Sequence, residues 1–194
     1  MRSFKRICIY GGARESVPRP YLDAAYGLGV FLAQRGVGVV TGGGRFGMMG
    51  AVTEGALSVG GQVYGVIPER LRALEQDHPL LTELFVVDSM HARKMIMATL
   101  SDAFIALPGG WGTLEEVFEV TTWNQLNYHR KPVALMNVEG YFDALLTYVQ
   151  NAVSVGFIRE SHAHLLGVGR SPEEVLGVLE TMEIPELGRW IDKP

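Results

Sequence analysis

Short apolar runs alternate along the chain with longer segments in which apolar residues recur every three or four positions. The short runs are apolar nearly throughout, a pattern typical of strands that are buried on both faces of a parallel sheet. We therefore expect strands at residues 6–10, 37–41, 62–67, 84–87, 103–107 and 132–136. The longer segments predict helices at residues 21–35, 48–58, 90–101, 113–127, 141–154 and 172–182.

This alternation of strands and helices predicts the fold class. A series of βαβ units gives an α/β fold, here a Rossmann-like, doubly wound parallel sheet flanked by helices. At 194 residues the chain is long enough to bury one full core, so we expect a single domain over residues 1–194. The last helix has a clear start, with Ser171 as N-cap and Pro172 at its first position. Residues 68–82 are the least regular, and the tail at 184–194 is expected to be flexible or to dock on a partner subunit.

Composition and charge narrow the range of partners. The formal net charge is −4 and no basic run offsets it, which argues against a nucleic-acid or membrane surface. Cys8, the only cysteine, lies in an apolar run and is expected to be a small buried hydrophobe rather than part of a disulfide. The N-terminus lacks the apolar core of a signal peptide, so we expect a cytoplasmic protein.

Ligands of such folds bind at the carboxyl ends of the strands, so the loops that follow strands are the first candidates for chemistry. After the first strand, GGARES at residues 11–16 offers backbone amides to an anion, with Arg14 and Ser16 nearby; a plain flexible turn explains it equally well. After the second strand comes TGGGRFGMMG, and a helix follows. This loop predicts a phosphate site at four glycines: Gly42, Gly43, Gly44 and Gly47.

The loop after the fourth strand, VDSMHARKM, places cations where they are unfavourable. Asp88 or Ser89 caps a helix whose first turns carry His91, Arg93 and Lys94. Cations in the first turns oppose the helix dipole. The loop therefore indicates a bound anion or a carboxylate partner, the alternative being solvated surface ion pairs.

The loop after the fifth strand, LPGGWGTLEEVFEV, combines clustered glycines with adjacent acids. Thr113 as N-cap and Glu116 three residues later form a capping box, which by itself explains the carboxylates. A capping box needs no glycines, whereas a backbone that a ligand approaches closely does. Gly109, Gly110 and Gly112 therefore favour a ligand site at this helix start.

Taken together, these motifs resemble the Lonely Guy family of phosphoribohydrolases, which activate cytokinins. That family shares P-G-G-x-G-T-x-x-E and an upstream M-H-x-R-K, which residues 108–116 and 90–94 match. The resemblance covers roughly residues 6–180. It implies hydrolysis of the N-glycosidic bond of a nucleoside 5′-monophosphate, either a cytokinin riboside 5′-monophosphate or AMP, to free base and ribose 5-phosphate.

The resemblance also assigns roles to residues. By motif position, Arg93 and Glu116 inherit the catalytic roles. Substrate contacts fall to Lys94, Gly109, Gly110, Trp111, Gly112, Thr113, Glu115 and Thr122. The family implies a homodimer with sites at or near the subunit interface, and it requires no metal or cofactor.

The chemistry suits these residue types. Breaking a ribosyl C–N bond builds positive charge on the sugar, which a carboxylate stabilises while it orients or deprotonates the attacking water. Glu116 is the first choice for this carboxylate and Glu115 the second. Arg93 offers a cationic fork to phosphate or ribose hydroxyls. The loops at 41–47 and 109–113 would hold the 5′-phosphate through backbone amides.

The chain departs from the family pattern in one loop, and two alternative functions remain open. Where the family has a serine-containing C-G-S turn, this chain has Tyr10-Gly11-Gly12-Ala13, which puts the contacts of that loop in doubt. The first alternative is a non-catalytic carrier of nucleotide or molybdenum cofactor, since such carriers also use a P-G-G-x-G-T loop. The second is an NAD(P)-dependent oxidoreductase, which the G-x-G-x-x-G match at residues 42–47 would favour. Against it, that match follows the second strand instead of the first.

Overall fold

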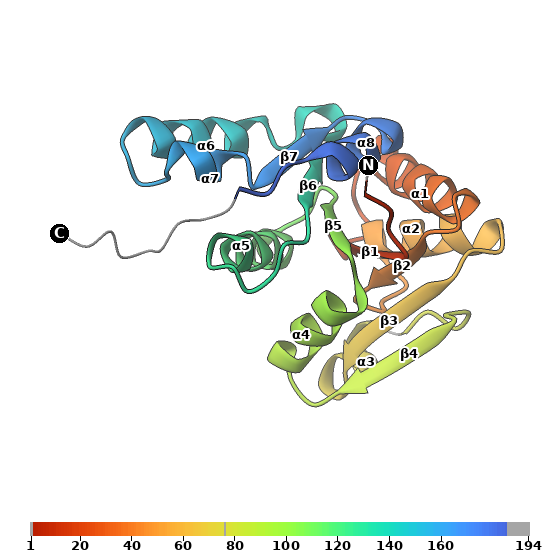
Figure 1. Ribbon diagram of the computed structural model, residues 1–194. Coiled ribbons are helices and arrows are strands. Elements are labelled where there is room, and N and C mark those ends of the chain that lie inside the picture. Colours follow the sequence, from red (N-terminus) through yellow and green to blue (C-terminus); the bar gives the residue numbers. More distant parts are fainter. Residues whose placement is uncertain (1, 76, 186–194) are drawn as a thin grey trace.

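A parallel sheet of seven strands forms the centre of the computed structural model, which describes residues 2–75 and 77–185 (Figure 1). The strand order is β4-β3-β2-β1-β5-β6-β7, and every neighbouring pair is parallel. The strands are β1 Arg6–Tyr10, β2 Gly38–Thr41, β3 Val63–Pro68, β4 Glu83–Val87, β5 Ala103–Ala106, β6 Val133–Met136 and β7 Leu166–Gly169. The predicted α/β, doubly wound fold is confirmed. The prediction for the tail lies outside the described residues from residue 186 onward.

Helices lie between the strands in the expected order. They are α1 Arg19–Gln34, α2 Gly47–Ser58, α3 Glu69–Glu75, α4 Met90–Leu100, α5 Trp111–Gln125, the 3₁₀ turn η1 Val138–Gly140, α6 Asp143–Ser154, α7 Glu160–Ala163 and α8 Pro172–Thr181. The elements that the pattern did not predict are β7, α3, η1 and α7, all of them short. Among the described residues, no helix is long and apolar enough to cross a membrane.

The core consists of two apolar layers, one on each face of the sheet. Ile7 and Ile9 of β1 pack with α1, α2 and α8. Cys8 and Tyr10, which point the other way, pack with α4 and α5. Cys8 is fully buried, as predicted. Because both faces are covered, every central strand is apolar nearly throughout, which is the pattern from which the sheet was predicted.

Two helix starts confirm the predicted caps. The Ser89 hydroxyl accepts a hydrogen bond from the amide of Ala92 at 3.2 Å, at the start of α4. The Ser171 hydroxyl likewise accepts from the amide of Glu174 at 3.2 Å, at the start of α8. These side chains fix where α4 and α8 begin, and α4 is the helix that carries Arg93.

The strand order reverses direction at β1 and β5, which places a crevice between the loops that follow them. Tyr10 pairs with Ala106, and the Leu107 amide donates to the Tyr10 carbonyl at 2.8 Å. The pairing continues past the strand ends, where the Gly12 amide donates to the Pro108 carbonyl at 3.0 Å. The first loop and the P-G-G loop therefore leave the sheet side by side.

Helices α1 and α2 touch through glycines. A Cβ at Gly29 of α1 would overlap the Val52 carbonyl of α2, and a Cβ at Gly55 of α2 would overlap the Tyr26 carbonyl of α1. The two backbones are therefore close enough to exclude even a methyl group. This contact joins the middle of α2 to α1.

Gly29→Ala tests this close approach. The added methyl would displace the α2 backbone, so we expect the free energy of unfolding in urea to fall by roughly 2–3 kcal/mol. Gly27→Ala is the matched control on the same helix, because a Cβ there meets nothing within 4 Å. It should raise the free energy of unfolding by roughly 0.5–1 kcal/mol. Equal effects of the two substitutions would contradict this account of the packing.

Candidate active site

A cleft of about 630 Å³ opens at the crevice between β1 and β5. Its walls come from the loops after these strands, from α2, α3, α4 and α5, and from Tyr141 ahead of α6. The two motifs that were predicted to act together, residues 90–94 and 108–116, both contribute to this cleft. The structure therefore brings Arg93 and Glu116 into one cavity from helices that are separated by β5.

Arg93 is held by backbone carbonyls. Its Nε donates to the carbonyl of Val66 at 3.0 Å, and its Nη2 donates to the carbonyl of Gly42 at 2.9 Å. The residue is almost completely buried, yet it lines the cleft. Carbonyls at the ends of β2 and β3 thus orient the guanidinium before any ligand arrives.

Glu116 of α5 lies in the same cleft, and the side chain is partly buried. Burial raises the pKa of Glu116 to about 7, because the loss of solvent outweighs the charge of Arg93, which acts in the opposite direction. A carboxyl group with a pKa near neutrality can take up and release a proton at working pH. This is the property required of a general acid or base.

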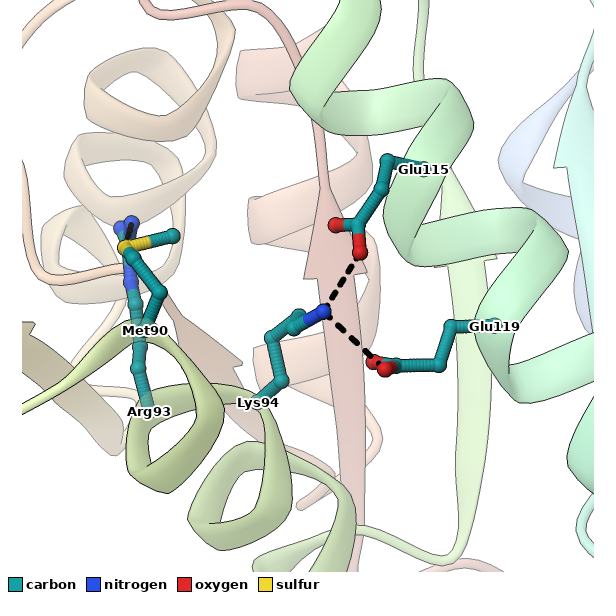
Figure 2. Close-up of polar contacts among 5 residues, drawn as sticks. All are labelled: Met90, Arg93, Lys94, Glu115 and Glu119. Carbon is teal, nitrogen blue, oxygen red and sulfur yellow. Dashed lines mark hydrogen bonds and ion pairs between the residues drawn. The ribbon is translucent and has the colours of Figure 1, made fainter.

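Lys94 points away from Arg93, toward α5 (Figure 2). Its Nζ contacts Oε1 of Glu115 at 2.5 Å and Oε1 of Glu119 at 3.0 Å. Burial disfavours its charge, but the hydrogen bonds to Glu115 and Glu119 outweigh burial, and the pKa of Lys94 is raised above its ordinary value. The predicted carboxylate partner for the cations of α4 is therefore found at Lys94, which joins α4 to α5. His91, on the same helix, is exposed.

The start of α5 differs from the prediction. The helix begins at Trp111 with Gly110 as N-cap, and no side chain caps it, so the predicted Thr113–Glu116 capping box is wrong. Thr113 instead packs its hydroxyl into the space that a Cβ of Gly109 would occupy. The amides of Trp111, Gly112 and Thr113 lie in the first turn and have no intrahelical acceptor. Gly112 and Thr113 line the cleft, and a Cβ at Gly110 or Gly112 would meet nothing within 4 Å.

The glycine-rich loop after β2 lies behind the cleft wall. Gly42, Gly43, Gly44 and Gly47 are not among the residues that line the cleft, and their phosphate contact stays a prediction. A Cβ at Gly42 would overlap the Arg93 guanidinium, so this glycine makes room for the arginine. Gly47 has a positive φ of 60°, which brings the start of α2 against the first loop. The wall itself is formed by the following side chains, Met48 and Met49.

Two other predicted contacts lie on the outer face of α5. Trp111, 90% exposed, and Thr122 line a separate groove of about 480 Å³ together with Leu114, Phe118 and Trp123. Within this chain, the structure does not bring these two residues together with Arg93 and Glu116. Glu115 borders both the cleft and this groove.

The first loop makes its contacts without a serine hydroxyl. The Gly12 amide donates to the Pro108 carbonyl, and the Gly12 carbonyl accepts from the Met48 amide at 2.8 Å. These are backbone contacts, so the departure at residues 10–13 leaves the junction between the loops intact. Arg14 lines the cleft.

Two aromatic residues of the cleft were not predicted from the sequence. Tyr141 lines the cleft and its hydroxyl donates to the Gly109 carbonyl at 2.6 Å. Tyr21 also lines the cleft and meets the Tyr141 ring edge-on, with centroids 6.0 Å apart. Tyr141 follows β6, the neighbour of β5. The place of Tyr141 after the carboxyl end of that strand is the sequence signal that could have identified it.

Comparison with known proteins identifies the family. A family model described as "Possible lysine decarboxylase" matches residues 49–179. A "Probable cytokinin riboside 5'-monophosphate phosphoribohydrolase" of Oryza sativa subsp. japonica is 51% identical over 84% of this chain and 71% of its own length. A cytokinin riboside 5'-monophosphate phosphoribohydrolase of Arabidopsis thaliana is 45% identical over 91% of this chain and 83% of its own. The chain belongs to the Lonely Guy family.

Solved structures show how widely the fold of the Lonely Guy family is shared. A molybdenum cofactor binding protein of Rippkaea orientalis has a TM-score of 0.70 and 25% identity, and the match covers 93% of this chain and 98% of that one. The molybdenum cofactor carrier protein of Chlamydomonas reinhardtii has a TM-score of 0.69 and 22% identity, over 91% and 96% of the two chains. The likeness to the second protein concerns the fold alone.

Glu116→Gln tests the buried carboxyl group. Its raised folded-state pKa means that the protonated carboxyl stabilises the fold below about pH 4.5, and that this contribution is lost as the pH rises through about 7. We expect Glu116→Gln to match the wild-type free energy of unfolding at acidic pH and to exceed it at alkaline pH, by roughly 2 kcal/mol. The exposed Glu173→Gln is the control for the loss of a surface carboxylate. A pH-independent difference for Glu116→Gln would contradict the raised pKa.

Proposed function

We propose that this chain hydrolyses the N-glycosidic bond of nucleoside 5′-monophosphates and releases the free base and ribose 5-phosphate. The observation that carries the proposal is the presence of Glu116 and Arg93 in one cleft beside the P-G-G loop. The relatives are named for action on cytokinin riboside 5'-monophosphates, and we propose these compounds as substrates together with AMP.

Glu116 supplies the carboxylate of the reaction. As the bond between the ribose C1′ and the base nitrogen breaks, the electron pair leaves with the base and positive charge builds on the sugar. The Glu116 carboxylate stabilises that charge and accepts a proton from the water whose oxygen bonds to C1′. The departing base takes up a proton, and a carboxyl with a pKa of about 7 can return the one it accepted.

Arg93 and the loop amides position the rest of the substrate. The guanidinium is fixed by the carbonyls of Val66 and Gly42, so it offers a preset cationic contact to ribose hydroxyls or phosphate. The first-turn amides of α5 and the positive end of its dipole suit the 5′-phosphate. In this arrangement, Lys94 acts through Glu115 by holding α5 against α4.

A carrier of molybdenum cofactor is the second candidate, because proteins with that role share the fold at a TM-score of 0.70. A carrier needs the anion-binding loop but has no evident use for a carboxyl of raised pKa beside a fixed arginine. The enzyme relatives are also more similar in sequence, at 51% and 45% identity. The hydrolase is therefore the better-supported function.

A second copy of this chain is the partner that we propose for the outer face of α5. This face is apolar around the groove that contains Trp111 and Phe118, and such a patch favours a protein interface. Because Glu115 borders both groove and cleft, a partner there would close the cleft from one side. Trp111 and Thr122 would then meet substrate across a homodimer interface. We also propose a cytoplasmic location, where the unpaired Cys8 stays reduced.

The enzyme proposal predicts that purified protein releases free base and ribose 5-phosphate in equal amounts from AMP and isopentenyl-AMP. The value of kcat/KM should rise as the pH passes through about 7, when Glu116 ionises. Glu116→Gln should lower kcat about 100-fold or more, whereas Glu173→Gln should not change it. Absence of cleavage of either substrate over a range of pH would disprove the proposal. Unchanged turnover in Glu116→Gln would exclude only Glu116 as the catalytic carboxylate.

The homodimer proposal predicts that Phe118→Glu weakens self-association, because it buries a charge in the interface. Sedimentation velocity should show the wild type as a dimer and this variant shifted to monomer. Val59→Glu is the matched control, since Val59 is 44% exposed and Phe118 is 42% exposed, but Val59 follows α2 on the other side of the sheet. A dimer that persists in Phe118→Glu would place the interface elsewhere.

A further inference from the structure

The carbonyls of three successive residues in the P-G-G loop, Pro108, Gly109 and Gly110, all accept hydrogen bonds. The Pro108 carbonyl accepts from the Gly12 amide at 3.0 Å, in the loop after β1. The Gly109 carbonyl accepts from the Tyr141 hydroxyl at 2.6 Å, ahead of α6. The Gly110 carbonyl accepts from the Leu114 amide at 3.1 Å, within α5. Of these donors, only the Tyr141 hydroxyl belongs to a side chain.

The bond to the Gly109 carbonyl also sets the direction of the next amide. In a trans peptide the C=O and the N–H point in opposite directions, so fixing the carbonyl of Gly109 fixes the N–H of Gly110. The peptide lies between two glycines, and a Cβ at Gly110 would meet nothing within 4 Å. On the Gly110 side there is therefore open space for a flip of this peptide plane, whereas Gly109 packs closely against Thr113 and Gly12.

Tyr141 is itself held in place. Its ring meets the rings of Tyr21 and Phe142 edge-on, with centroids 6.0 and 5.1 Å apart. Phe142 is buried in the core, whereas Tyr141 is 46% exposed and lines the cleft. The ring contacts thus aim the hydroxyl at the loop from a fixed position.

We propose that Tyr141 is a positioning residue that keeps the Gly109–Gly110 peptide in the orientation that binds phosphate. With the carbonyl held by Tyr141, the Gly110 amide is available beside the first-turn amides of α5. In the flipped orientation a carbonyl would take its place and repel a phosphate dianion. This inference rests on the proposed function, because it requires that the loop receive the 5′-phosphate of the substrate.

Tyr141→Phe removes the hydroxyl and keeps the ring. We expect the inhibition constant of ribose 5-phosphate and the KM of AMP to rise about tenfold, as for loss of one hydrogen bond to a charged group. The inhibition constant of free adenine should stay at the wild-type value, and kcat should change less than KM. Tyr148→Phe, on the exposed surface of α6, is the control and should leave all of these values unchanged.

The outcomes separate this inference from the proposed function. A wild type that neither cleaves AMP nor binds ribose 5-phosphate in calorimetry overturns both. A wild type that does, with a Tyr141→Phe variant that binds ribose 5-phosphate equally well, overturns the role of Tyr141 alone. Equal losses for ribose 5-phosphate and adenine also overturn it, because they indicate general damage to the cleft.

Gly110→Ala provides a second test. The φ of Gly110 is −97°, which alanine accepts, but a peptide flip would carry this angle into the positive region that alanine disfavours. We expect Tyr141→Phe to raise the inhibition constant of ribose 5-phosphate less in the Gly110→Ala background than in the wild type. The same fold-increase in both backgrounds would overturn the flip.

Discussion

The two backbone hydrogen bonds of Gly12 are the interactions on which the arrangement of the cleft depends. Its N–H bonds to Pro108 in the loop after β5, and its C=O accepts from Met48 at the start of α2. Three segments far apart in sequence therefore meet at one residue, at the point where the strand order reverses. A Cβ at Gly12 would lie 3.3 Å from the Gly109 Cα, so the contact leaves little room for a side chain. The first loop, the P-G-G loop and the start of α2, which form three walls of the cleft, are thereby placed relative to one another.

The charged side chains around the cleft have different partners because they lie on different faces of their helices. Glu115, Glu116 and Glu119 follow one another closely on α5, but they have different partners. Lys94 binds Glu115 and Glu119, whereas Glu116 shares the cleft with Arg93. Burial then raises the pKa of Glu116 although a cation is near, because the charge of Arg93 only partly offsets the loss of solvent.

The sequence was sufficient for six of the seven strands and most of the helices, since apolar runs buried on both faces are easily recognised. It also identified Ser89 and Ser171 as caps, because those residues act within one turn. The elements it missed, such as β7 with glycine at two of its four positions, are too short to show a period. The pairing of Arg93 with Glu116 in one cavity came from the family resemblance, and the residues alone favoured an anion site without locating it.

The errors have a common physical cause. The capping box at Thr113 failed because α5 begins earlier, at Trp111, where the glycine backbone itself starts the helix. For the glycines at 42–47 the sequence predicted only a phosphate contact and missed that Gly42 makes room for Arg93. Tyr141 escaped notice because its hydrogen bond to Gly109 joins segments more than thirty residues apart. In each case a glycine or hydroxyl has several possible neighbours, and only the tertiary structure decides between them.

Glu115 forms an edge of the cleft and an edge of the outer groove at once. A single turn of α5, which Lys94 holds to α4, therefore separates the cleft from the outer groove. Glu115 acts electrostatically on Glu116, so a partner that changes the surroundings of Glu115 in the groove would also change the pKa of Glu116. The turn of α5 that carries Glu115 thus couples the two cavities, so that a partner bound in the groove would alter the reaction in the cleft.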